Sequence, residues 1–112
     1  MTCRCLRPPF DARDYDSVPV GVDETRGRFG EVSLETCRAC GNLWLRYFVE
    51  YEDVSGSGRW YRGLVSREVA DGVTPENAVE ILQRLEWRFA GGSWFGPTAT
   101  GSRSSGPVLV DR

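Results

Sequence analysis

Four cysteines stand in two groups in this 112-residue chain, Cys3-Arg4-Cys5 near its start and Cys37-Arg38-Ala39-Cys40 near its middle. Thiolates spaced in this way can point at the same metal ion, and two such groups supply the four sulfur ligands of a tetrahedral site. Gly41 follows the second group and permits the positive φ that a sharp reversal of the chain requires. The sequence therefore predicts one metal site, whose ligands are Cys3, Cys5, Cys37 and Cys40.

Other uses of the four cysteines are open at this stage: buried unliganded thiols, a disulfide scaffold or a thioredoxin-type dithiol. The first residues include no apolar segment typical of a signal peptide, so we expect a cytoplasmic location, where thiols stay reduced. A thioredoxin-type CxxC opens a helix after a strand, whereas Cys37 and Cys40 precede a predicted strand. These arguments favour the metal site, with either zinc or iron as the ion.

The cysteine pattern resembles that of zinc ribbons and, more loosely, of rubredoxins, which hold a metal between two cysteine pairs at hairpin tips. The resemblance covers the turn Cys37–Gly41, the strands predicted on both sides of it, and the pair Cys3 and Cys5. It implies a structural zinc ion, with a rubredoxin-like iron centre for electron transfer as the alternative. The first pair is CxC where both families have CxxC, and the long arm and the added helix enlarge the chain well beyond a minimal rubredoxin. Together these differences favour zinc.

Alternating side chains predict an antiparallel sheet of about three strands. The strands are expected at residues 31–36, 43–52 and 59–66, with a Ser/Gly-rich hairpin loop at 53–58. In the second strand Leu43, Leu45 and Tyr47 point to one face, whereas Trp44 and Phe48 point to the other. We therefore expect aromatic side chains on both faces of a small zinc-ribbon-like sheet.

A helix is expected over residues 74–90. Thr74 is a suitable N-cap, and Pro75 stands at the favoured first position. An apolar stripe at helical spacing should pack across one sheet face, and its members are Ala78, Ile81, Leu82, Leu85 and Phe89. Gly91 and Gly92 are expected to end the helix.

These elements predict one α+β domain over residues 1–112. An irregular N-terminal arm that carries the CxC pair should span residues 1–31, with at most one short strand near residues 18–22. The sheet with its CxxCG turn should span residues 32–66, followed by the helix at 74–90. A Gly/Ser-rich segment should fill residues 91–112.

Composition excludes many catalytic mechanisms. The chain contains no histidine, and all 14 of its cationic side chains are arginine, so it has neither the usual general base near neutral pH nor a Schiff-base amine. The net charge of -2 argues against a polycation that grips nucleic acid or an anionic membrane. Glu35, Glu50 and Glu52 could gather on one sheet face, but alternate acidic residues usually form the solvated side of a strand. We expect a protein that is not an enzyme.

Two stretches are candidates for partner binding. Arg59, Trp60 and Arg62 interleave cations with an aromatic ring, as nucleic-acid grooves do, and they could equally stack within the sheet. Trp94 and Phe95 stand in a Gly-rich segment, where they either cover the core or contact a partner. The resulting hypothesis is a zinc-binding module that contacts another protein, of adaptor or immunity type, with nucleic-acid binding as an alternative and no membrane partner.

Overall fold

The computed structural model describes residues 3–49, 58–92, 98–99, 101–103 and 108. Its main element is a six-stranded antiparallel sheet with the strand order β2-β3-β4-β5-β6-β8, beside a two-stranded pair β1-β7. The strands are β1 (Phe10–Asp11), β2 (Tyr15–Asp23), β3 (Gly30–Cys37), β4 (Leu43–Val49), β5 (Arg59–Val65), β6 (Arg88–Gly91), β7 (Thr98–Ala99) and β8 (Ser102–Arg103). The α-helices are α1 (Arg67–Asp71) and α2 (Ala78–Arg84), and 3-10 turns occupy Arg4–Leu6, Ala12–Asp14 and Thr25–Gly27.

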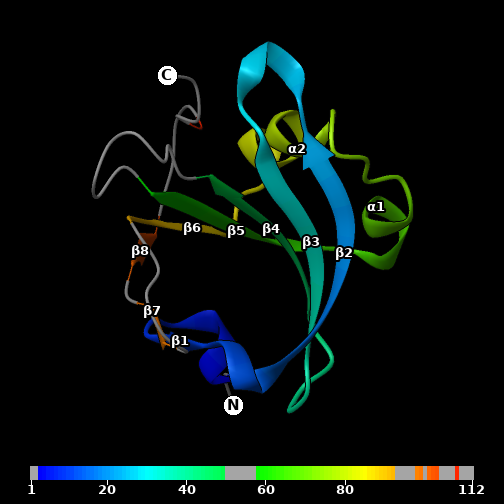
Figure 1. Cartoon of the computed structure of the whole chain (residues 1–112). Coiled ribbons are helices and arrows are strands. Elements are labelled where there is room, and N and C mark those ends of the chain that lie inside the picture. Colours follow the sequence, from blue (N-terminus) through cyan, green and yellow to red (C-terminus); the bar gives the residue numbers. More distant parts are fainter. Residues whose placement is uncertain (1–2, 50–57, 93–97, 100, 104–107, 109–112) are drawn as a thin grey trace.

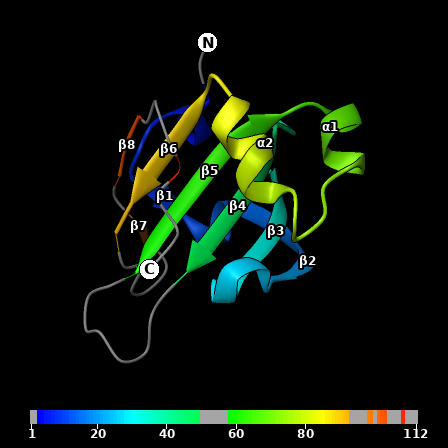
Figure 2. The same cartoon turned by 90° about the horizontal axis from the view of Figure 1, so that it is seen from above.

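Both faces of the sheet are covered, and each covering has its own apolar core. On one face α1 and α2 pack against alternate residues of β4 and β5, among them Leu45, Tyr47 and Tyr61. The N-terminal segment covers the opposite face, where Phe10 packs against Trp44. Figure 1 shows the helices and the N-terminal segment on opposite sides of the bent sheet, and Figure 2 shows α2 across β4 and β5. The predicted placement of aromatic side chains on both faces is confirmed.

The sheet is larger than the three strands predicted. The central strands β3, β4 and β5 match the predicted ones, but β2, β6 and β8 extend the sheet on both sides. The short strand expected near residues 18–22 is present, but it is longer and makes the second half of the expected irregular arm regular. As β2 it pairs along nearly the whole length of β3, with a bulge between Pro19 and Gly21. As an edge strand, β2 buries few of its side chains, so the alternation that reveals a strand is weak.

The helix predicted over residues 74–90 is shorter in the structure. Thr74 and Asn77 exchange hydrogen bonds in the turn before α2, which begins at Ala78 and ends at Arg84. The following residues pair with the open edge of β5 as β6, which carries Phe89 to the opposite face of the sheet. Tertiary pairing thus overrides the helical period of the sequence at that position.

The remaining members of the predicted stripe behave as expected. Ala78 and Leu82 are fully buried in the helix-side core, and Ile81 and Leu85 pack against it. The buried Arg88 donates a 2.7 Å hydrogen bond from Nη1 to the carbonyl oxygen of Leu82, which also accepts from the Leu85 amide at the end of α2. No helix in the described part of the chain has both the length and the apolar character that crossing a membrane requires.

Candidate metal centre

A tight turn presents the first cysteine pair. Cys3 directly precedes the 3-10 turn Arg4–Leu6, and its carbonyl oxygen accepts a 3.0 Å hydrogen bond from the Leu6 amide. Cys5 lies within the turn and is buried in the core beneath it. Because the turn is this tight, both thiols project toward the end of β3.

The second pair lies in the turn between β3 and β4, which we call the knuckle (residues 37–41). Cys37 is the last residue of β3, and its carbonyl oxygen accepts a 2.8 Å hydrogen bond from the Gly41 amide. Gly41 has a φ of 80°, the left-handed conformation that the sequence predicted for this position. The reversal brings Cys40 back beside Cys37.

The structure brings the four cysteines together as predicted. Their Sγ atoms all lie within 4.8 Å of one another, with 3.7 Å between Cys3 and Cys37 and 3.5 Å between Cys5 and Cys40. A tetrahedral zinc site with Zn–S bonds of about 2.3 Å has sulfur–sulfur edges of about 3.8 Å. None of the four, all of which are described, forms a disulfide. The cluster therefore has the dimensions of a tetrathiolate metal site.

The thiols differ in burial and in acidity. Cys5 and Cys37 are buried, Cys3 is half-buried and Cys40 is exposed. A hydrogen bond from the Cys5 backbone amide, helped by the Cys40 thiol, lowers the pKa of Cys3 to about 7. Burial raises the pKa of Cys5, although the Asn42 side-chain amide, 3.7 Å from its sulfur, acts in the opposite direction. Since a metal binds thiolates, its binding would displace protons from this cluster.

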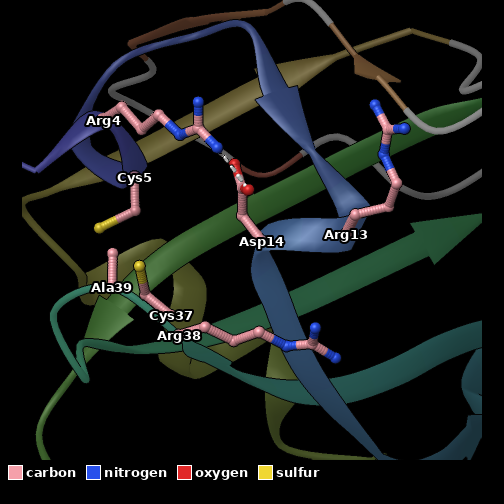
Figure 3. Close-up of a pocket in the computed structure, with 7 residues that line it drawn as sticks. All are labelled: Arg4, Cys5, Arg13, Asp14, Cys37, Arg38 and Ala39. Carbon is pink, nitrogen blue, oxygen red and sulfur yellow. Dashed lines mark hydrogen bonds and ion pairs between the residues drawn. The ribbon is translucent and has the colours of Figure 1, made fainter.

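A pocket of about 240 Å³ lies beside the cluster, between the N-terminal segment and the knuckle. Its lining residues are Arg4, Cys5, Arg13, Asp14, Cys37, Arg38 and Ala39 (Figure 3). The arginines form exposed ion pairs, at 2.6 Å from Arg4 to Asp14, 2.7 Å from Arg13 to Asp11 and 3.0 Å from Arg38 to Asp16. Because each guanidinium already has a carboxylate partner, the pocket holds no excess of positive charge over these pairs.

The residues predicted to bind a partner differ in their exposure. Arg59 is exposed, whereas Trp60 and Arg62 are fully buried, so the stretch does not form an exposed row of arginine and aromatic side chains. The side chains that bury these two residues include Trp44 of β4, Phe10 of the N-terminal segment and Phe89 of β6. The last two are distant from residues 60–62 in sequence. Trp94 and Phe95 lie outside the described residues, as do Glu50 and Glu52.

Sequence reasoning missed a buried ion pair close to the metal centre. Arg62 Nη1 donates a 2.6 Å hydrogen bond to Glu35 Oε1, and both side chains are buried. The guanidinium carbon lies 4.2 Å from the ring centroid of Tyr15, 5.0 Å from that of Phe10 and 5.5 Å from that of Trp44. The alternation of Trp60, Arg62 and Leu64 on one strand face was the available signal for this burial.

Comparison with known proteins identified no family for the chain. No protein-family model matches the sequence, and neither the curated proteins nor the solved structures include a significant match. What the chain does must therefore be inferred from the four-cysteine cluster and its surroundings, a cluster that can hold a metal ion.

Proposed function

We propose that the protein binds one zinc ion through Cys3, Cys5, Cys37 and Cys40 and that this ion has a structural role. The observation that carries the proposal is the gathering of four sulfur atoms within 4.8 Å from two distant parts of the chain. Four protein ligands complete a tetrahedron and leave no position for a substrate or a reactive water molecule. Such a site contributes to folding directly, which is valuable in a small domain.

Elemental analysis of the purified protein, combined with a thiol count after denaturation, tests this proposal. We expect about one zinc and no iron per chain, with four reactive thiols. Cys37→Ser should abolish metal binding, whereas Arg38→Ala, a change at an exposed neighbour in the same turn, should leave the stoichiometry unchanged. Protein that binds no metal after reconstitution under reducing conditions would contradict the proposal.

Iron in the same four-sulfur site is the second candidate, because tetrahedral sulfur ligation suits both metals. It would make the protein a rubredoxin-like electron carrier. The zinc-ribbon and rubredoxin patterns both use CxxC for the first pair, so the CxC turn does not separate the two metals. The six-stranded sheet and the two helices make the domain much larger than a minimal rubredoxin, and this favours zinc. A coloured preparation that bleaches on reduction and contains stoichiometric iron would replace zinc by iron in the proposal.

We also propose that the protein acts by binding another protein, as an adaptor or an immunity-type module, and that it is not an enzyme. The lack of histidine and lysine supports this view, together with a closed metal site. Exposed Val18 and Phe29, at 62% and 64% accessibility, offer apolar contact area on β2 and on the β2–β3 connection. We expect a purified partner to bind the unsubstituted protein and not the double variant Val18→Ser/Phe29→Ser, whose stability should be unchanged. Turnover of a substrate would refute the proposal that the protein is not an enzyme.

Nucleic-acid binding through residues 59–62 has less support, because Trp60 and Arg62 are buried. Titration with labelled single strands at low salt should show no binding. A cytoplasmic location fits a site made of four thiols, because thiols stay reduced there, and fractionation of cells would test it.

A further inference from the structure

The N-terminal residues 3–14, which we call the strap, cover one face of the sheet. Phe10 inserts from the strap between Trp60, Trp44 and Phe89, with its ring 5.0 Å from that of Phe89 and 5.8 Å from that of Trp60. Cys5 adds a second buried side chain to the same core. The strap therefore closes an aromatic face that also contains the guanidinium of Arg62.

Besides the cysteine cluster, two hydrogen bonds join the strap to the β3–β4 turn. The Arg38 amide donates to the Asp14 carbonyl oxygen over 2.9 Å, at the end of the strap far from Cys3, and the Asn42 side-chain amide lies 3.7 Å from the Cys5 sulfur. The ion pair between Arg4 and Asp14 lies within the strap, and that between Arg38 and Asp16 joins the knuckle to β2, so neither fixes the Cys3–Cys5 turn to the sheet. The pocket of about 240 Å³ separates this turn from the knuckle, so packing along the seam is incomplete (Figure 3). The four sulfur atoms meet between the Cys3–Cys5 turn and the knuckle, and each of these two turns contributes two of them.

The opposite face of the sheet is independent of the strap. Its core consists of buried residues from β3, β4, β5, α1 and α2 together with Val108, and none of the described residues of the strap belongs to it. The pairing of β3, β4 and β5 likewise involves no residue of the strap. The two faces can thus differ in their response to a change at the cysteines.

We propose that the metal ion is a latch, so that its loss releases the strap while the sheet and both helices stay folded. This inference rests on the proposed metal site. Among the described residues, the strap without the ion keeps the apolar contacts of Phe10, Cys5 and Leu6, the short β1–β7 pairing and its covalent link to β2. It also keeps the hydrogen bond from the Arg38 amide to the Asp14 carbonyl oxygen and that from Asn42 to the Cys5 sulfur. Release exposes Trp44, Trp60 and the Arg62–Glu35 pair, which the strap otherwise keeps from solvent.

Residue-resolved amide hydrogen exchange, with the full chain in zinc-loaded form and after chelation under reducing conditions, tests the latch. The strap reporters are the amides of Leu6 and Arg7, which donate to Cys3 and Arg4 carbonyls. The reference reporters are the amides of Ile81 and Leu85 in and after α2. We expect chelation to accelerate exchange of the first pair by about 100-fold and of the second by less than about threefold.

Two results would overturn the latch. Equal acceleration of both pairs would mean that the domain unfolds as one unit, and no acceleration of either would mean that packing alone holds the strap. The variant Phe10→Ala, measured with zinc bound, distinguishes the contribution of the metal from that of packing. The strap amides of this variant should still exchange slowly, and fast exchange despite bound zinc would refute the latch. Elemental analysis of each sample keeps the outcomes distinct, since a chain that holds no metal refutes the proposed function as well.

Discussion

Replacement of Arg62 by methionine should strongly destabilise the protein, although it changes no exposed side chain. Arg62 is fully buried, and its only described acceptor is Glu35, at 2.6 Å, which is itself 6% exposed. Its Nε and Nη2 atoms have no hydrogen-bond acceptor among the described residues, and three aromatic rings surround the guanidinium instead. The substitution therefore removes the hydrogen-bonded counter-charge of a buried carboxylate.

The expected loss follows from this geometry. Removal of one partner from a buried ion pair costs about 3–5 kcal/mol, because the other charge stays buried without its hydrogen-bonded partner. Among the cations described around it, Glu35 keeps the electrostatic interaction with Arg46. Lost cation–π contacts with Tyr15, Phe10 and Trp44 add to the cost by about 0.5–1 kcal/mol each. Contacts of the methionine sulfur with the same rings, and removal of two unpaired N–H groups, offset much of that addition. We therefore expect a net loss of about 3–5 kcal/mol.

Urea unfolding of the metal-loaded proteins, followed by circular dichroism, measures this loss. Arg59→Met is the matched control, because Arg59 is an exposed arginine on the same strand, and it should change the free energy of unfolding by less than about 0.5 kcal/mol. The double variant Arg62→Met/Glu35→Met should recover most of the loss, since it removes both charges. If the free energy of unfolding of Arg62→Met differs from that of the unsubstituted protein by less than about 1 kcal/mol, the argument for a buried pair is wrong.

Two further changes test the hydrogen bonding of the sheet and the conformation of the knuckle. Tyr47 donates a 2.8 Å hydrogen bond to buried Asp23, so Tyr47→Phe should cost about 1.5–3 kcal/mol in urea unfolding. Burial raises the pKa of Asp23, but hydrogen bonds from Thr25 and Tyr47 outweigh it and hold that pKa below its ordinary value. The associated stability is present above pH of about 4 and is lost as the pH falls through the folded-state pKa; an equally steep acid loss in Tyr47→Phe would contradict this assignment. Gly41→Ala should cost about 1 kcal/mol and weaken zinc binding in a chelator competition, because φ is 80° there, whereas Gly72→Ala should be nearly neutral; unchanged affinity in Gly41→Ala would refute the role of that turn.

The predicted sheet succeeded where both faces of a strand are buried. In residues 43–49 one face carries only apolar side chains, and the other carries two aromatic rings with Arg46 between them. The strand is therefore evident from the sequence, and the predicted assignment of its faces is confirmed. The cysteine cluster was predictable for a chemical reason, since a tetrahedral sulfur site needs four ligands and the chain has four. Neither inference needed knowledge of distant packing.

The failures share a different cause, which is that long-range contacts decide the structure. Phe89 continues the helical spacing of Leu85, but the open edge of β5 recruits it into β6. Arginine usually lies at the surface, so the sequence alone suggests an exposed Arg62. Arg62 is buried because Tyr15 and Phe10, from the N-terminal part of the chain, pack over it. No local period of the sequence contains these contacts.

The location of the cysteines is explained by how the two faces of the sheet are closed. On one face, the helices α1 and α2 come directly after β5 in the chain and supply apolar side chains to the core. That face is therefore covered by elements close to β5 in sequence. The other face is closed by a segment without a helix, of which Cys5 and Phe10 are the buried members. Such a segment buries too little apolar surface to offset the entropy of its ordering. A metal ion held by Cys3 and Cys5 of this segment and by Cys37 and Cys40 at the end of β3 would supply the missing free energy there. This is a structural reason for a closed site with four protein ligands.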